Sequence, residues 1–131
     1  MPDGAVSDKH RNLAVRSATN AYCERLLQDI IGPIREVAYE RGYAVAVHGS
    51  LANDIDLLAA PWVDHAGDPD ELAKAIQGAV AGIVGKCLLH AKDGKLHGDK
   101  PHGRRAYTLM LWPLSYIDLS VMPRQQPEAQ Q

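Results

Sequence analysis

The chain has 131 residues, the length of one compact domain, and its 46% hydrophobic and 23% charged content is typical of a globular protein. This excludes a disordered chain, a collagen-like fibre and a small disulfide scaffold. The net charge of -2 supplies no positive field, which makes nucleic acid an unfavoured partner. The sequence has no apolar run of about 18 residues and no basic-then-apolar leader, so we expect a cytoplasmic protein that does not contact a membrane.

Helical periodicity runs from about Lys9 to Arg41. Gly32-Pro33 interrupts it and predicts a kink or two helices that meet there, because proline lacks an N–H and clashes with the preceding turn. Residues 1–8 and 123–131 offer little to bury, so we expect both ends to be flexible. The chain contains no linker, which predicts a single minimal domain over residues 1–131.

Two strands are expected next, over Tyr43–His48 and Asp54–Ala60. Both are rich in apolar residues, and the second is closed by Pro61. The short connection between them predicts antiparallel neighbours.

A second helix is predicted from the Asp68 N-cap to about His90, with Cys87 on its apolar stripe. Glycines such as Gly78 weaken this helix, and close packing onto a sheet would explain them. Cys23 and Cys87 both lie among apolar neighbours, which favours two buried thiols over the alternative of a disulfide.

A polar loop over residues 91–105 follows. Ala106–Trp112 and Ser115–Met122 are then expected to form a hairpin around Pro113. The element order is helix, strand, strand, helix, strand, strand. It predicts an α+β fold in which helices pack on one side of a small mixed or antiparallel sheet.

The most informative segment combines Gly49-Ser50 with Asp54 and Asp56. Residues two apart on a strand project from the same face, and two carboxylates so placed resist joint ionisation. A divalent cation such as Mg²⁺ or Mn²⁺ would remove the repulsion. Gly49 permits close backbone approach and Ser50 adds a hydroxyl where a phosphate could sit.

A third carboxylate, Asp118, shares one face of the last strand with Tyr116 and Ser120. If that strand neighbours the one that carries Asp54 and Asp56, three carboxylates converge. Such a cluster could hold two metal ions, one activating a nucleophile and one stabilising a leaving phosphate.

At these residues the chain resembles the nucleotidyltransferase superfamily, which has the polymerase-beta-like fold. Its signature is a strand ending in Gly-Ser or Gly-Gly, then Asp-x-Asp on the next strand and a third Asp on a later one. Gly49-Ser50, Asp54-Ile55-Asp56 and Asp118 match these elements. The resemblance implies catalytic metal ligands at Asp54, Asp56 and Asp118, with Asp118 as a candidate base, and triphosphate contacts at Gly49 and Ser50.

The segment His48–Leu57, followed by Pro61-Trp62, is similar to small phage- or prophage-encoded members of this group. The implied activity is transfer of a nucleoside monophosphate from an NTP to an unknown acceptor, with Mg²⁺ or Mn²⁺ as cofactor. Short members of the fold could complete their site across a homodimer. Within the basic loop 91–105, Lys100 and Arg104 are candidate nucleotide ligands, and a solvated surface loop is the alternative.

Other interpretations of the same residues remain open. Only Leu51, Ala52 and Asn53 separate Gly49-Ser50 from Asp54, where family members usually have a longer connection. The shorter connection favours an inactive member of the fold that binds a nucleotide or a protein partner. A two-metal phosphodiesterase would use the same carboxylates, and Asn53-Asp54 could also be plain turn residues.

Overall fold

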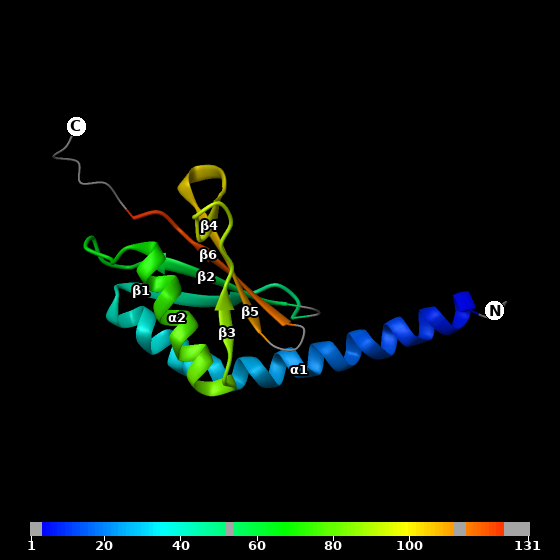
Figure 1. Ribbon diagram of the computed structural model, residues 1–131. Helices are drawn as coiled ribbons and strands as arrows, with labels where there is room; N and C mark the ends of the chain where they lie inside the picture. The colour runs from blue at the N-terminus through cyan, green and yellow to red at the C-terminus, as the bar shows by residue number, and fades with distance from the viewer. Residues whose placement is uncertain (1–3, 52–53, 112–114, 125–131) are drawn as a thin grey trace.

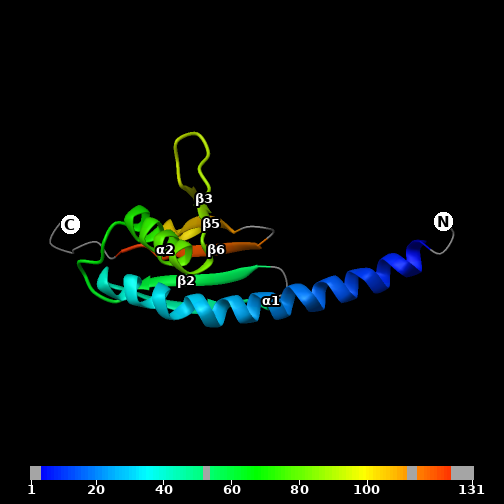
Figure 2. The ribbon, with the colours of Figure 1, turned by 60° about the horizontal axis from the view of Figure 1, so that its bottom comes forward.

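The computed structural model describes residues 4–51, 54–111 and 115–124 (Figure 1). The fold is α+β, as predicted, with both helices on one side of a mixed six-stranded sheet (Figures 1 and 2). The helices are α1 (Gly4–Glu40) and α2 (Pro69–Val84). The strands are β1 (Tyr43–His48), β2 (Ile55–Pro61), β3 (Cys87–Leu89), β4 (His97–Asp99), β5 (Arg105–Leu111) and β6 (Ser115–Val121).

The sheet has the order β1-β2-β6-β5-β3, and β4 pairs with β5 beside β3. Strands β1 and β2 are antiparallel neighbours, and β5 and β6 form the predicted antiparallel pair. Pro113, around which the turn was expected, lies outside the described residues. The central strands β2 and β6 pair in parallel, and this pairing joins the two halves of the chain.

The first helix begins earlier than the predicted helical pattern, at Gly4, and it runs through Pro33 without dividing in two. The alternative of two helices that meet at Gly32-Pro33 is therefore wrong, and a kink there stays a prediction. Proline inside a helix costs about 3 kcal/mol. Ile30 and Ile34 flank the proline and are both fully buried, and each contributes about 1.5–3 kcal/mol by burial, which offsets that cost. The N-terminal part of α1 extends beyond the sheet (Figure 2).

The second helix begins as the sequence predicts. The Asp68 carboxylate accepts hydrogen bonds from the backbone N–H groups of Asp70 (3.1 Å) and Glu71 (3.3 Å). Tyr107 on β5 donates its hydroxyl to Asp70 Oδ1 at 2.6 Å. The start of α2 is therefore fixed to the sheet as well as capped.

The end of α2 was predicted too late, because the helix stops at Val84 and not near His90. Gly85 adopts a left-handed conformation (φ 91°) and terminates it, which lets Cys87 enter β3. Cys23 and Cys87 are both buried, as predicted, and are not joined in a disulfide. Gly78 is exposed with open space beside it, so the expected close packing at this glycine is wrong.

The segment predicted as a plain loop over 91–105 carries structure. It contains β4 and a short 3₁₀ turn, Pro101–Gly103. Asp93 and Gly94 both have positive φ and form a tight turn, across which Lys92 and Lys95 exchange backbone hydrogen bonds of 2.9 and 3.0 Å. A two-residue Asp-Gly turn of this kind gives the loop a fixed shape.

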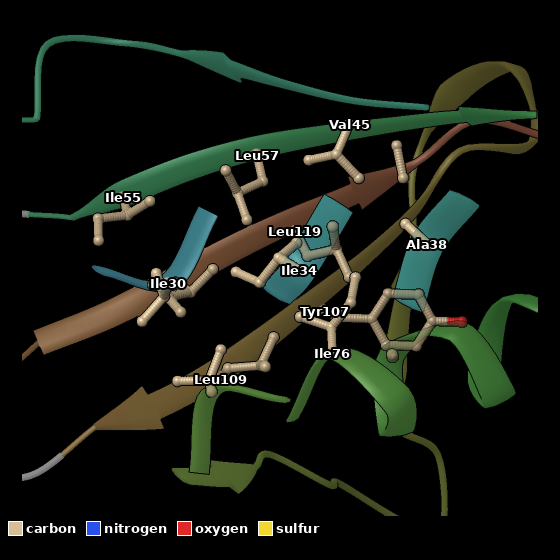
Figure 3. Packing of buried hydrophobic residues seen from close by; sticks show 14 of the residues in the cluster. Ile30, Ile34, Ala38, Val45, Ile55, Leu57, Ile76, Tyr107, Leu109 and Leu119 are labelled. Atoms are coloured by element: carbon tan, nitrogen blue, oxygen red, sulfur yellow. The ribbon is translucent and has the colours of Figure 1, made fainter. Parts of the chain in front are cut away.

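The hydrophobic core lies between the helices and one face of the sheet (Figure 3). Leu57 and Leu119 from the central strands meet Ile34 of α1 and Ile76 of α2, and all four are buried. The opposite face of the central strands carries polar and charged side chains. In the described parts of the chain, neither helix combines the length and hydrophobicity that a membrane span requires.

Candidate functional site

The face of the sheet that the helices leave open carries a row of polar residues across four strands. Asp56 on β2 pairs with Asp118 on β6, so two carboxylates predicted from sequence lie side by side. His48 on β1 pairs with Asp56, and Thr108 on β5 pairs with Asp118. Paired residues on neighbouring strands point to the same face with Cβ atoms about 4.5–5.5 Å apart.

Asp54, the residue directly before β2, adds a third carboxylate beside this pair. Burial, followed by the negative charge of Asp56, raises the pKa of Asp54 above its usual range. The pKa of Asp118 is raised by burial, then by the charges of Asp54 and Asp56, and also by a hydrogen bond with Asp56. The three carboxylates therefore interact with one another, as expected for a cluster whose negative charge is not compensated.

A divalent cation matches the chemistry of these oxygen donors. Across residues 4–51, 54–111 and 115–124, no three Asp, Glu, His or Cys side chains already surround a common point as metal ligands. Burial and the charges of Asp54 and Asp56 favour the protonated form of Asp118. A cation at this cluster would compensate the negative charge and favour the ionised carboxylates.

The chain bends sharply beside the carboxylates, at the end of β1. Gly49 has φ 81°, and a Cβ atom added to it would overlap Oδ2 of Asp56. Only glycine fits both the conformation and the space. The backbone of the predicted Gly49-Ser50 element is therefore in direct contact with the predicted carboxylate element.

The first helix holds this bend in place. Asn20 donates its side-chain amide to the carbonyl oxygens of Ser50 (3.2 Å) and Leu51 (3.0 Å). Sequence reasoning missed Asn20, although an Asn within a helix is a weak signal that its amide has a partner elsewhere.

Tyr116 also lies beside the carboxylates, although the sequence did not mark it as a site residue. It lies on the open face two residues before Asp118 and is 46% exposed. Its register neighbour is Met110, which in turn pairs with Leu88, itself 49% exposed. The three side chains form an apolar ledge beside the carboxylates.

The two basic candidates of the loop have different surroundings. Arg104 is partly buried, and its Nη1 donates to Ser120 Oγ at 2.9 Å. Ser120 lies on the same strand and face as Asp118. Ser120 follows Asp118 on that face of β6 by about 6.6 Å, so Arg104 is held at the open face one step along the strand from Asp118. Lys100 is exposed, and its backbone N–H donates to the carbonyl of Arg104 at 2.9 Å.

No family model, curated protein or solved structure compared with the chain matches it. The function must therefore be inferred from the residues themselves. The open face presents three interacting carboxylates, a glycine bend against one of them and an exposed aromatic ring beside another.

Proposed function

We propose that the protein is a metal-dependent nucleotidyltransferase that transfers a nucleoside monophosphate from an NTP to an acceptor. The parallel register of β2 and β6 carries this proposal, because it sets Asp56 beside Asp118 on an open face. Asp54, Asp56 and Asp118 would hold Mg²⁺ or Mn²⁺. The bound cation would neutralise phosphate charge and orient the triphosphate.

The bend at the end of β1 would receive the triphosphate. Gly49 brings the backbone against Asp56, and Ser50 adds an N–H and a hydroxyl. Asn20 holds the backbone of the bend through the carbonyl oxygens of Ser50 and Leu51. Because this backbone is fixed, a phosphate at the bend would require little reorganisation of the protein.

Tyr116 is suited to the nucleoside. Its ring is half exposed beside Asp118, and stacking a base on an aromatic ring contributes about 1–3 kcal/mol. Asp118 would take the proton of the acceptor hydroxyl as that oxygen bonds to the α-phosphorus. The bond from the α-phosphorus to its bridging oxygen breaks, and pyrophosphate leaves.

The test is calorimetric titration of ATP, GTP, CTP and UTP into the full chain with Mg²⁺, with Mn²⁺ and with EDTA. We expect metal-dependent binding of at least one NTP, lost in Asp54→Asn/Asp56→Asn and retained in Asp64→Asn. Asp64 is an exposed carboxylate beyond the end of β2, which makes it a matched control.

Two results would contradict the proposal. One is a folded wild-type chain that binds no NTP. The other is binding that persists unchanged in the Asp54→Asn/Asp56→Asn variant. Products from a labelled NTP would then separate transfer from hydrolysis, because transfer leaves the label on the acceptor.

A further inference from the structure

A basic pocket lies beside the carboxylates on the side away from Gly49. Its volume is about 590 Å³, and it is lined by residues of the 90–100 segment together with Ala106 and Thr108 of β5. Sites for small molecules commonly measure about 300–1,000 Å³. The pocket is therefore large enough for a molecule of mononucleotide or sugar phosphate size.

Positive charge dominates the pocket lining. Three lysines, Lys92, Lys95 and Lys100, stand against the single carboxylate Asp93. Lys95 Nζ also lies 3.9 Å from a carboxylate outside the lining, Asp99 Oδ2. The excess of positive charge is well suited to an anionic ligand.

The tight Asp93-Gly94 turn sets two of these lysines directly opposite each other. Lys92 and Lys95 form an antiparallel bridge with hydrogen bonds in both directions. Like charges directly opposite each other on paired strands destabilise the pairing. An anion bound between them would remove this repulsion.

The pocket adjoins the carboxylate row through one residue. Thr108 lines the pocket and pairs with Asp118 across β5 and β6. Neighbouring strands are about 4.8 Å apart, so the pocket begins about one strand beyond Asp118. Gly49 touches Asp56 on the opposite side, where β1 borders β2.

We infer that this pocket binds the phosphate of a small phosphorylated acceptor, whose hydroxyl is thereby presented to the carboxylates. The inference rests on the proposed nucleotidyltransferase function, because the NTP would occupy the Gly49 side of the row. The acceptor hydroxyl oxygen bonds to the α-phosphorus of the NTP, and Asp118 accepts the hydroxyl proton. Pyrophosphate leaves with the electron pair of the broken bond. The net charge of -2 makes a small phosphate ester a better match than a long nucleic acid.

Binding to the pocket is tested first without metal. Ribose 5-phosphate is titrated into the full chain in EDTA, with neutral ribose as the control ligand. We expect binding of ribose 5-phosphate alone, weakened about tenfold for each lysine removed in Lys92→Gln and Lys100→Gln. Lys86→Gln, which changes an exposed lysine outside the pocket lining, should leave this binding unchanged.

The acceptor role is tested next, by mass spectrometry of the products formed from NTP, Mg²⁺ and either ribose 5-phosphate or ribose. We expect a nucleotidylated product from ribose 5-phosphate only. Ribose 5-phosphate binding that is absent, or that is insensitive to Lys92 and Lys100, would overturn the inference. Lysine-dependent binding of a single-stranded oligonucleotide that exceeds binding of ribose 5-phosphate would overturn the assignment to a small acceptor.

The two proposals can fail separately. NTP binding that depends on Asp54 and Asp56, without ribose 5-phosphate binding, would leave the nucleotidyltransferase and reject the acceptor pocket. Lysine-dependent binding of ribose 5-phosphate to a chain that binds no NTP would reject the nucleotidyltransferase, and the acceptor role with it.

Discussion

The two faces of the central strands differ although the same strands build both. On β2, Ile55, Leu57 and Ala59 point to the helices and are buried, while Asp56 and Leu58 between them are only partly buried. The covered face is determined by packing against α1 and α2. The open face has no such packing to satisfy, so it can carry carboxylates that would be costly in the core.

This difference predicts that stability and chemistry can be altered separately. Substitution of side chains that pack against the helices should change the free energy of unfolding. Substitution of side chains on the open face should change ligand binding. Four experiments test the contrast, from the largest expected effect to the smallest.

Leu57→Ala and Leu58→Ala compare the two faces at neighbouring residues of one strand. Leu57 is fully buried in the core, so its truncation should lower the free energy of unfolding by about 2–5 kcal/mol. Leu58 is only partly buried on the open face, and its truncation should cost less than about 1.5 kcal/mol. Urea denaturation measures both, and equal losses would contradict the assignment of the two faces.

Gly49→Ala and Gly94→Ala separate backbone strain from crowding. Both glycines have positive φ, 81° and 77°, but only at Gly49 would a Cβ atom meet the Asp56 carboxylate. Gly94→Ala should cost about 1–2 kcal/mol from its conformation alone. Gly49→Ala should cost a further 1–3 kcal/mol, roughly, and should also weaken metal-dependent NTP binding. A loss at Gly49 no larger than at Gly94 would show that the bend does not press on Asp56.

The raised pKa of Asp118 predicts the sign of a pH dependence in the metal-free protein. Its pKa in the folded chain lies above the ordinary value of 3.8, so the folded state binds that proton more tightly than the unfolded state. The stabilisation is complete below the ordinary value and is lost as pH rises through the raised pKa. Asp118→Asn should therefore flatten the decline in stability between acidic and neutral pH.

Urea denaturation of the chain in EDTA at several pH values measures that decline. Asp64→Asn, which changes an exposed carboxylate away from the cluster, should leave the decline as it is in the wild type. The opposite result is a contribution of Asp118 that makes stability rise with pH. In that case Asp118→Asn would remove a rise and not a decline, and the predicted sign would be wrong.

Gly78→Ala is expected to have the smallest effect and to be stabilising. The glycine is exposed in the interior of α2, and nothing lies within 4 Å of an added Cβ atom. Replacing it by Ala should raise the free energy of unfolding by about 0.8–1 kcal/mol. Gly85→Ala is the control, because its φ of 91° makes the same change unfavourable there. A thermal melt distinguishes the two, and a destabilised Gly78→Ala would mean that α2 has a partner at this surface.

The sequence predicted those features that depend on local chemistry. The Asp68 cap, the limits of β1 and its antiparallel pairing with β2 follow from rules that act within a few residues. Asp54, Asp56 and Asp118 stood out because charges are unusual on apolar strands.

Features that depend on distant parts of the chain could not be read from the sequence. Pro33 stays within one helix because residues on both sides are buried in the same core. The parallel pairing of β2 with β6 is one of several topologies that the same strands allow. The turn at Asp93-Gly94 is different, because an Asp-Gly pair is a local hairpin signal and the prediction of a plain loop missed it. Asn20 contributes to the site only because the end of β1 returns to α1.

The pairing of Asp56 with Asp118 also has a consequence for how the protein folds. The two residues lie in different halves of the chain. The whole segment from α2 to β5 lies between β2 and β6 in the sequence, and it must form a closed loop before these strands can pair. Contacts between residues so far apart in sequence require closure of a long loop, which slows folding. During synthesis, Asp54 and Asp56 are added to the chain well before Asp118. The carboxylate cluster is therefore completed late in synthesis. The repulsion of Asp118 with Asp54 and Asp56 is therefore absent while the first half of the sheet forms.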